Sequence, residues 1–485
     1  MSLRRSVLSG LFWAGGTRLI GQALTWAITI VVIRLLSPDD YGLLAMAMVF
    51  VNLLFLLAEA GLGAALVQAP KADEPNLRAI FAAIVLVDFA LFALLIASAP
   101  AIAHFFDEDR LTLIIRILAL QFLISIFAVI PTALLTRALD FKHQSVIGLA
   151  AAFCGSVTTL VLALSGYGVW ALIIGNLTAH LLNTVGINLV SPFLKWPDFS
   201  LRGARQLLVI GGQMTAARVL WFIYSQADIF IAGRLLGKEL LGFYSVSMHL
   251  ASRPVQRISA VINQVAFPAF ARSQHDPELV SRYLLKALRL LFFVSFPVLW
   301  GISSIAPEIV GVLLGAKWSR AVVPLQLLPL IMPLSIVSPF LNTAFQGIGH
   351  SGVVFRNTLT ACLIMPAAFC IGANWGLVGL SLAWVVGFPI VLAFNLRRML
   401  PLVALNLRDV FSVAAPALLG SCGMYAAVTI TRHFAADRFE SAVLMLVLIG
   451  VGATSYAALA WTANRTGVGE LADLLNVHRL WGKQA

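Results

Sequence analysis

Four arginines lie near the middle of hydrophobic stretches that are long enough to cross a bilayer: Arg18, Arg218, Arg253 and Arg257. A charged side chain at the membrane midplane costs about 2.5–3.5 kcal/mol on insertion scales, so the four together cost about 10–14 kcal/mol. Arginines this far from the ends of a helix cannot reach the headgroups, and they persist where they face a water-filled cavity. The sequence therefore predicts a cationic cavity that binds an anion inside a membrane bundle.

Other polar residues share faces with these arginines. Gln22 follows Arg18 by one helical turn, and with Thr25 and Thr29 they form a single polar stripe. The next two hydrophobic stretches each carry one acid, Glu59 and Asp88. These acids could pair with Arg253 and Arg257 and so hold helices together. Even complete pairing would leave two of the four arginines without an acid, so the predicted cavity is net positive. The predicted substrate-binding residues are Arg18, Gln22, Arg218, Arg253 and Arg257.

Composition excludes a soluble protein. Hydrophobic residues make up 60% of the 485 residues and charged residues 11%, with a mean hydropathy of +0.94, whereas soluble domains contain roughly 25% charged residues. The basic residues cluster in short loops between apolar runs, which fits membrane topology better than nucleic-acid binding. No P-loop, zinc-ligand spacing, nucleophile elbow or long catalytic loop is found. The sequence predicts neither an enzyme nor a bound cofactor or metal.

Windows of about 19 residues predict an all-α protein with about fourteen transmembrane helices. The prolines between 297 and 346 make the pattern weakest there. The predicted spans are 9–33, 42–67, 79–103, 112–135, 145–165, 168–190, 206–230, 242–268, 283–306, 321–346, 353–373, 376–396, 409–431 and 440–462.

The distribution of basic residues predicts the orientation. With the N-terminus in the cytoplasm, the inner segments carry nineteen Lys and Arg residues and the outer segments eight. The positive-inside rule favours this arrangement and places both termini in the cytoplasm.

An internal repeat predicts the domain organisation. RLLSPDDYG at 34–42 matches RLLGKELLG at 234–242, and the same offset of 200 places Arg18 over Arg218. We expect two six-helix lobes, residues 1–200 and 201–400, followed by two appended helices and a tail in 401–485. Six crossings return the chain to its starting side, so the halves should be related by an axis along the membrane normal, with the substrate site at their interface.

The stretch FWAGGTRLIGQALTWAITIVVIRLLSPDDYGLLAMA, followed by AEAGLGAALVQ at 58–68, resembles the Wzx-like polysaccharide flippases. They belong to the polysaccharide transporter branch of the multidrug/oligosaccharidyl-lipid/polysaccharide exporter superfamily. The resemblance implies a bacterial inner-membrane protein of two lobes, with helices 1, 2, 7 and 8 lining a cleft. It implies alternating-access transport of a polyprenyl-pyrophosphate-linked oligosaccharide for surface polysaccharide (exopolysaccharide, capsule or O-antigen) biosynthesis.

The resemblance also gives the charged residues roles. The arginines would neutralise the diphosphate, and Glu59 and Asp88 would couple transport to a proton or sodium gradient. Polysaccharide polymerases or export proteins would be possible partners, besides membrane lipid.

Two other functions remain open. A multidrug antiporter of the same fold would need an acidic cavity for cationic drugs, which four midplane arginines disfavour. A membrane glycan polymerase or ligase would need a substantial external loop, which we do not find in this sequence.

Overall fold

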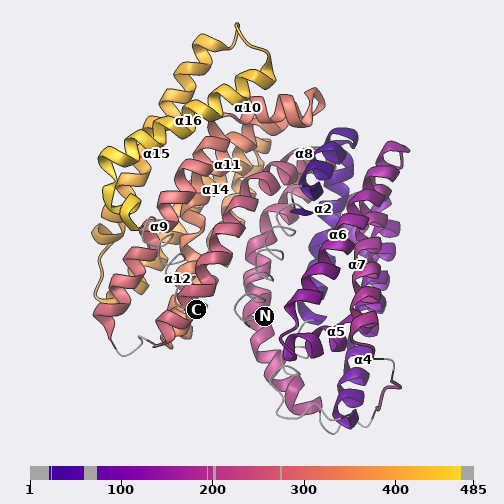
Figure 1. The fold of residues 1–485 in the computed structure, drawn as a ribbon. Coiled ribbons are helices and arrows are strands. Elements are labelled where there is room, and N and C mark those ends of the chain that lie inside the picture. Colours follow the sequence, from indigo (N-terminus) through magenta and orange to yellow (C-terminus); the bar gives the residue numbers. More distant parts are fainter. Residues whose placement is uncertain are drawn as a thin grey trace, which may run out of the picture. The chain divides into compact units, whose positions relative to one another are not determined.

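The computed structural model is helical throughout the part of the chain that it describes (Figure 1), which comprises residues 21–22, 24–58, 74–193, 195–199, 204–272 and 276–470. Within those residues there is no β-strand, and twelve helices are long and apolar enough to cross a membrane. A shorter apolar helix, Leu24–Leu35, lies in the first predicted span. The predicted all-α polytopic architecture is therefore confirmed, with fourteen as an approximate count.

The chain divides into two compact units, Met1–Gly242 and Phe243–Ala485. The dividing point falls inside the long helix α8 (Ala204–Arg272), so it does not coincide with the predicted lobe boundaries at 200 and 400, which stay a prediction. The first unit contains the N-terminal part of α8 and five earlier helices: α2 (Pro38–Ala58), α4 (Glu74–Phe106), α5 (Arg110–Arg137), α6 (Phe141–Leu164) and α7 (Val169–Val190).

Helix α8 merges the spans that the sequence predicts at 206–230 and 242–268. The backbone at Gly237 departs from helical geometry, with φ 79° and ψ 177°. Residues with a Cβ atom rarely adopt a positive φ, whereas glycine adopts it readily, so Gly237 permits the break in the helix. α8 thus consists of two helical segments joined at the second copy of the repeated RLL motif.

The second unit begins with the C-terminal part of α8. It continues with α9 (Pro277–Ser304), α10 (Ala306–Ile309), a π-helical turn (Val310–Leu314), a 3-10 turn (Ala316–Ala321), α11 (Val322–Ser335), α12 (Val337–Gly347), α13 (Ser351–Ala373), α14 (Gly376–Met399), a 3-10 turn (Leu400–Val403), α15 (Leu407–Ala435) and α16 (Ser441–Ala463). The tenth predicted span, 321–346, is divided between α11 and α12 at Ile336. It contains Pro324, Pro329, Pro333 and Pro339, and proline removes a backbone donor and weakens helix continuity.

Helix pairing recurs in the two units. In the first unit, α4 packs on α5, α5 on α7, and α6 on α7. In the second, α9 packs on α11, α11 on α14, and α13 on α14, in the same order along the chain. The same pairings support the internal repeat inferred from the RLL motifs.

Glycine residues allow two of these helix pairs to approach closely. A Cβ atom on Gly155 of α6 would meet the Gly175 carbonyl of α7 at 2.7 Å, and a Cβ atom on Gly372 of α13 would overlap the Gly379 carbonyl of α14. Glycine at such positions lets two backbones approach closely, as is common where membrane helices pack.

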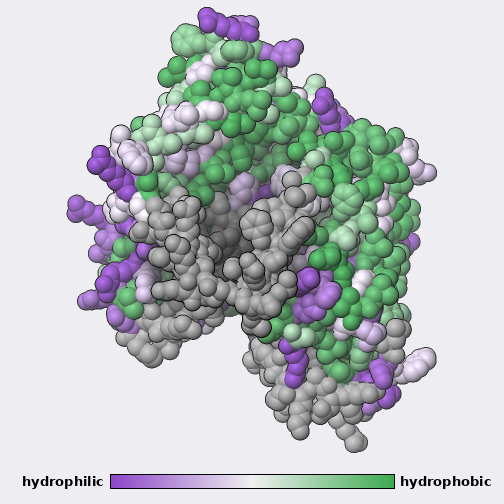
Figure 2. All heavy atoms as spheres, viewed as in Figure 1, coloured by the Kyte–Doolittle hydropathy of each residue, from purple (hydrophilic) through white to green (hydrophobic). Residues whose placement is uncertain are grey.

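Hydrophobic side chains cover much of the visible surface (Figure 2). Many large ones are exposed, including Leu189, Leu363 and Phe434 at 80%, 69% and 68%. A soluble protein seldom exposes apolar residues so widely, whereas a membrane protein must present them to lipid. The surface therefore supports the multi-pass membrane topology.

Candidate functional site

The predicted site residues are only partly described. Arg18 and Glu59 lie outside the described residues. Arg218 and Arg257 belong to α8, but their side chains are outside that description. Gln22, Asp88 and Arg253 are described fully, so the structure informs three of the seven positions.

Asp88 lies midway along α4, and its side chain is buried, with 2% exposed. The hydroxyl of Ser125, on the neighbouring helix α5, donates a hydrogen bond to Asp88 Oδ2 at 3.0 Å. No ion pair joins Asp88 to a described basic residue. A buried carboxylate without a cationic partner is costly inside a membrane, whereas a protonated carboxyl in the same place costs far less. This environment suits a carboxyl that takes up and releases a proton.

The polar stripe of the first span is partly satisfied by its own helix. Thr25 Oγ1 donates to the Gly21 carbonyl at 2.9 Å, and Thr29 Oγ1 donates to the Thr25 carbonyl at 2.8 Å. Such bonds to the preceding turn are common for threonine and carry no evidence of ligand binding. Gln22 is half-buried on the same helix.

Arg253 lies on α8 and is exposed. No ion pair links it to a described acid, and Pro254 follows directly. The described residues thus provide no support for the alternative in which Arg253 holds helices together through an acid.

The two copies of the RLL motif pack against each other reciprocally. A Cβ atom on Gly42 would overlap the Lys238 carbonyl oxygen, and a Cβ atom on Gly242 would overlap the Pro38 carbonyl oxygen. Both pairs of equivalent positions are 200 residues apart, and all four residues lie in the first unit. A contact in which position i meets j, and j meets i, is the mark of a local twofold relationship. The repeat is therefore present in the packing as well as in the sequence.

An ion pair and aromatic contacts reinforce this reciprocal contact. Lys238 Nζ lies 2.5 Å from Glu108 Oε2, where Glu108 is in the turn between α4 and α5. The Phe230 ring of α8 stacks on Phe105 of α4 with a centroid distance of 4.6 Å, and the guanidinium of Arg234 lies 5.8 Å from the Phe105 ring centroid. α8 is thereby fixed to the end of α4 next to its own break at Gly237.

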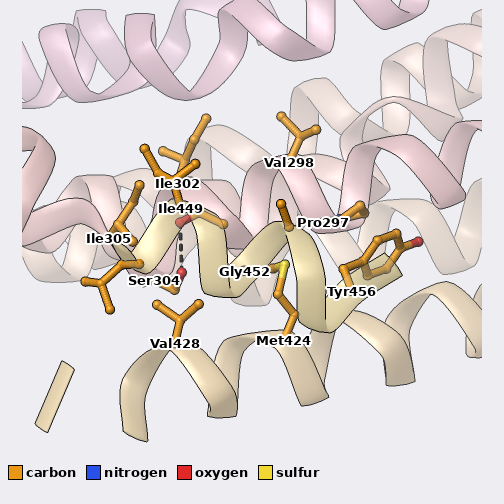
Figure 3. A pocket seen from close by; sticks show the side chains of 13 residues that line it. Pro297, Val298, Ile302, Ser304, Ile305, Met424, Val428, Ile449, Gly452 and Tyr456 are labelled. Atoms are coloured by element: carbon orange, nitrogen blue, oxygen red, sulfur yellow. Dashed lines mark hydrogen bonds between the residues drawn. The ribbon is translucent and has the colours of Figure 1, made fainter. Parts of the chain in front are cut away.

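The second unit contains an apolar pocket of about 400 Å³ between α9, α15 and α16 (Figure 3). Its lining includes Ile302 of α9, Ile305 directly after α9, Val428 of α15, and Ile449 and Gly452 of α16. Of the predicted site residues that the structure describes, Gln22, Asp88 and Arg253, none lines it. The pocket can hold a hydrocarbon segment and offers no charged group to a polar ligand.

Two ion pairs lie around this three-helix assembly. Arg432 of α15 bonds to both oxygens of Glu308 and to the Ser304 carbonyl. Arg289 of α9 pairs with Glu470, which follows α16. The first pair links α15 to α10, and the second links α9 to the segment after α16.

The sequence did not predict three contacts: the hydrogen bond from Ser125 to Asp88, the Lys238–Glu108 ion pair and the reciprocal packing of Gly42 and Gly242. Ser125 and Glu108 are 37 and 130 residues from their partners, and no local pattern indicates such pairing. Gly42 and Gly242 end the repeated RLL motifs, so their equivalence was visible even though their contact was not.

The comparisons with known proteins agree with the proposed resemblance. Residues 31–323 match the family described as "Polysaccharide biosynthesis protein". The chain is 24% identical over 453 residues to the succinoglycan biosynthesis transport protein ExoT of Rhizobium meliloti, covering 92% of this chain and 91% of ExoT. It is 24% identical over 405 residues to the lipopolysaccharide biosynthesis protein WzxC of Escherichia coli, covering 81% and 80%. Relatives of this kind confirm the prediction of a transporter in place of an enzyme.

Solved structures share the fold. The lipid II flippase MurJ in an inward closed conformation matches with a TM-score of 0.73 and 15% identity, covering 93% of this chain and 99% of MurJ. An inward-facing multidrug transporter of the MATE family matches with a TM-score of 0.63 and 17% identity, covering 79% and 94%. At these identities the matches establish the fold alone. Because the family match spans more than half of the residues, the chain belongs to the polysaccharide biosynthesis protein family.

Proposed function

We propose that this protein translocates a polyprenyl-pyrophosphate-linked oligosaccharide from the inner to the outer leaflet of the bacterial cytoplasmic membrane. The observation that carries the proposal is the family match across residues 31–323, on a fold shared with a lipid II flippase. The named functions of ExoT and WzxC in glycan biosynthesis support a glycan as the cargo. The excess of basic residues in the predicted inner segments supports cytoplasmic termini.

The proposed diphosphate site consists of Arg18, Gln22, Arg218, Arg253 and Arg257. A diphosphate needs several cationic donors to leave water for a cavity of low dielectric constant, and guanidinium groups bind phosphate oxygens in pairs. Exposed Arg253, without a described acid partner, supports this role. The arginines would bind the head group on one side and release it on the other.

The proposed coupling residues are Glu59 and Asp88. For Asp88, the support is burial on α4, a hydrogen bond from Ser125 and the lack of a described cationic partner. A carboxyl in this position is neutral when protonated and strongly disfavoured when charged. Its protonation would therefore favour one helix packing over another, which is what ion-coupled alternating access requires. For Glu59, the support is its position with Asn52 on one helix face.

The reciprocal contact of Gly42 and Gly242 supplies a closing point for the outer side. By the proposed orientation, both repeated motifs lie in outer connections. In this contact the backbone of one motif packs directly on the backbone of the other. No side chain between them can change its rotamer to keep the contact when the backbones move apart, so the contact is either made or lost. The Lys238–Glu108 pair would stabilise the closed arrangement.

The apolar pocket gives the lipid part of the cargo a place to lie. An isoprenoid chain is hydrocarbon throughout, and the pocket between α9, α15 and α16 is lined almost wholly by apolar groups. Transfer of each CH₂ from water to an apolar site contributes about 0.8 kcal/mol. The isoprenoid chain would enter the pocket from lipid and not from water, so this gain does not apply. Shape complementarity is therefore the proposed basis of recognition there.

The alternatives are weaker. The fold also occurs in a multidrug transporter, but midplane arginines repel cationic drugs, and the family match is to polysaccharide biosynthesis proteins. A glycan polymerase or ligase is disfavoured by relatives named as transport proteins.

Purified variants test the diphosphate site. Replacing Arg18, or both Arg253 and Arg257, by Ala should weaken lipid-linked glycan binding by two to four orders of magnitude, because breaking one side of a buried charge pair costs about 3–5 kcal/mol. Lys at these positions should restore binding only in part. Binding is measured per folded molecule, so unchanged binding with lowered thermal stability would show that the arginines only hold helices together.

A gene deletion tests the function in cells. Surface polysaccharide should be lost, and lipid-linked oligosaccharide should accumulate where a membrane-impermeant lectin added to spheroplasts cannot reach it. Accumulation on the accessible side would place the defect after translocation and refute the flippase assignment.

A further inference from the structure

The ends of α13 and α14 present a cluster of arginines without acids. From residue 309 to residue 408 the sequence contains no Asp or Glu, yet it contains Arg356, Arg397 and Arg398. All three side chains are exposed. Neither helix can therefore neutralise this charge with an acid of its own.

Arg398 is held in place by neutral acceptors. Its Nη1 atom donates to the Arg356 carbonyl at 3.3 Å, to Asn357 Oδ1 at 3.3 Å and to Thr360 Oγ1 at 2.7 Å. Every one of these partners lies on α13, so Arg398 of α14 joins the two helices. The same guanidinium lies 5.9 Å from the Phe394 ring centroid. These contacts fix the orientation of the group, and no acid in the described part of the chain forms an ion pair with it.

The arginines border an apolar surface on the same two helices. Ile390 and Phe394 precede Arg397 and Arg398 at helical spacing on α14, and they are 46% and 44% exposed. On α13, Phe355 and Leu359 next to the cluster are 48% and 43% exposed. In a bilayer such side chains contact acyl chains, and arginines at their edge lie at the level of headgroups.

We infer that Arg356, Arg397 and Arg398 form a binding site for the phosphate of an anionic phospholipid whose acyl chains lie along Phe355, Leu359, Ile390 and Phe394. The positive-inside tendency accounts for basic residues near this end of the helices, but not for a fixed guanidinium beside an apolar surface on two packed helices. Basic pockets between transmembrane helices bind anionic lipid headgroups by this combination of charge and apolar contact. By the orientation proposed above, the lipid belongs to the cytoplasmic leaflet. The site shares no residue with the proposed transport site and does not require that the cargo be a glycan.

The test is a titration of the full-length protein, purified in a neutral detergent, with dioleoylphosphatidylglycerol, using dioleoylphosphatidylcholine as the neutral lipid. Native mass spectrometry counts the bound lipids. Arg356→Gln and Arg397→Gln should each weaken phosphatidylglycerol binding about fivefold, the equivalent of about 1 kcal/mol per basic residue near the surface. Arg408→Gln, at an exposed arginine outside the cluster, is the matched control and should leave binding unchanged.

Arg398→Lys separates charge from fixed geometry. Lysine keeps the charge but cannot reproduce the guanidinium contacts, so binding should weaken less than in Arg398→Gln. Equal phosphatidylglycerol binding by the native protein and the folded Arg356→Gln and Arg397→Gln variants would overturn the proposal. So would equal affinity for phosphatidylcholine, or complete displacement of the lipid by inorganic phosphate, which would indicate a site for a soluble anion.

Discussion

Two buried acids, one in each unit of this protein, have different kinds of partner. Around α9, α15 and α16 in the second unit, buried Glu308 is paired with Arg432, and Arg289 is paired with Glu470. In the first unit, Asp88 is equally well buried, yet its described partner is the neutral hydroxyl of Ser125. A paired charge can be explained by structure alone, whereas a buried acid without a cation is a cost that needs another reason. Among the described residues, the comparison therefore distinguishes acids that link helices through an arginine from Asp88, for which we propose a role in transport.

The largest effect should follow from breaking a paired charge. Arg432→Ala leaves Glu308, which is 7% exposed, without a cation, and the loss should be about 3–5 kcal/mol of stability. Thermal unfolding of the purified protein measures it. Adding Glu308→Gln should recover most of the loss, and Arg438→Ala, at an exposed arginine after α15, should have little effect. If Arg432→Ala kept native stability but stopped transport, Arg432 would be functional and the comparison would fail.

Substitution of Gly42 and Gly242 tests whether the two copies of the RLL motif contribute equally to their contact. Gly42→Ala and Gly242→Ala each place a methyl group on a backbone carbonyl, and overpacking of this kind costs about 1–3 kcal/mol. Both variants should shift the protein toward an open outer side by similar amounts. The readout is modification of a cysteine introduced at Ser37, in a background without native cysteines, by a membrane-impermeant maleimide.

Gly450→Ala is the matched control for these variants, because a Cβ atom there meets nothing within 4 Å. A shift produced by only one of the two glycine variants would show that the copies of the repeat are not equivalent.

Asp88→Asn should have a small effect on stability and a specific effect on coupling. The amide keeps an acceptor for Ser125 and removes the charge, so thermal stability should be unchanged or slightly higher. Transport should become independent of the proton gradient. Ser125→Ala should lower stability by about 1 kcal/mol through loss of one hydrogen bond, while leaving gradient dependence in place. Full gradient dependence in Asp88→Asn would rule out the coupling role.

The smallest effect concerns a helix cap outside the membrane spans. Asp140 caps α6 by accepting a bond from the His143 amide at 3.2 Å, and its carboxylate lies 2.7 Å from His143 Nδ1. The side-chain hydrogen bond from His143 lowers the pKa of Asp140 below its usual value. A carboxyl with a lowered pKa stabilises the folded state above its ordinary pKa of about 4, and this contribution is lost as the pH falls through the lowered value.

Hydrogen exchange measures the cap directly. Protection of the first-turn amides of α6 should therefore decrease below about pH 4, and Asp140→Ala should show the decreased protection already at neutral pH. Protection that did not change with pH would show that the carboxylate contributes nothing to the cap.

The fold was largely predictable because hydropathy reports helices in a membrane. The first unit follows the predicted spans closely, with α5 at Arg110–Arg137 for the predicted 112–135. The exceptions arise where backbone geometry, and not hydropathy, determines where a helix begins or ends. Gly237 joins two predicted spans into α8, and the span at 321–346 is divided at Ile336.

The types of residue in the proposed site were predictable from the sequence, but the contacts that these residues make were not. The types of its residues follow from the cost of charge in a membrane, which singled out Asp88. Its partner Ser125 is one serine among many, and only the packing of α4 on α5 brings the two together. The contact between Gly42 and Lys238 likewise depends on tertiary structure, although the 200-residue repeat marked both segments.

Translocation by the purified protein tests the central claim most directly. Vesicles are reconstituted with the protein and with lipid-linked oligosaccharide extracted from a strain in which the gene is deleted, and a membrane-impermeant lectin reports the glycan exposed outside. We expect lectin-accessible glycan to increase only in vesicles that contain the protein, with a strongly reduced rate for the Arg253→Ala/Arg257→Ala double variant. Transport of cationic drugs with no movement of the glycan would contradict the account.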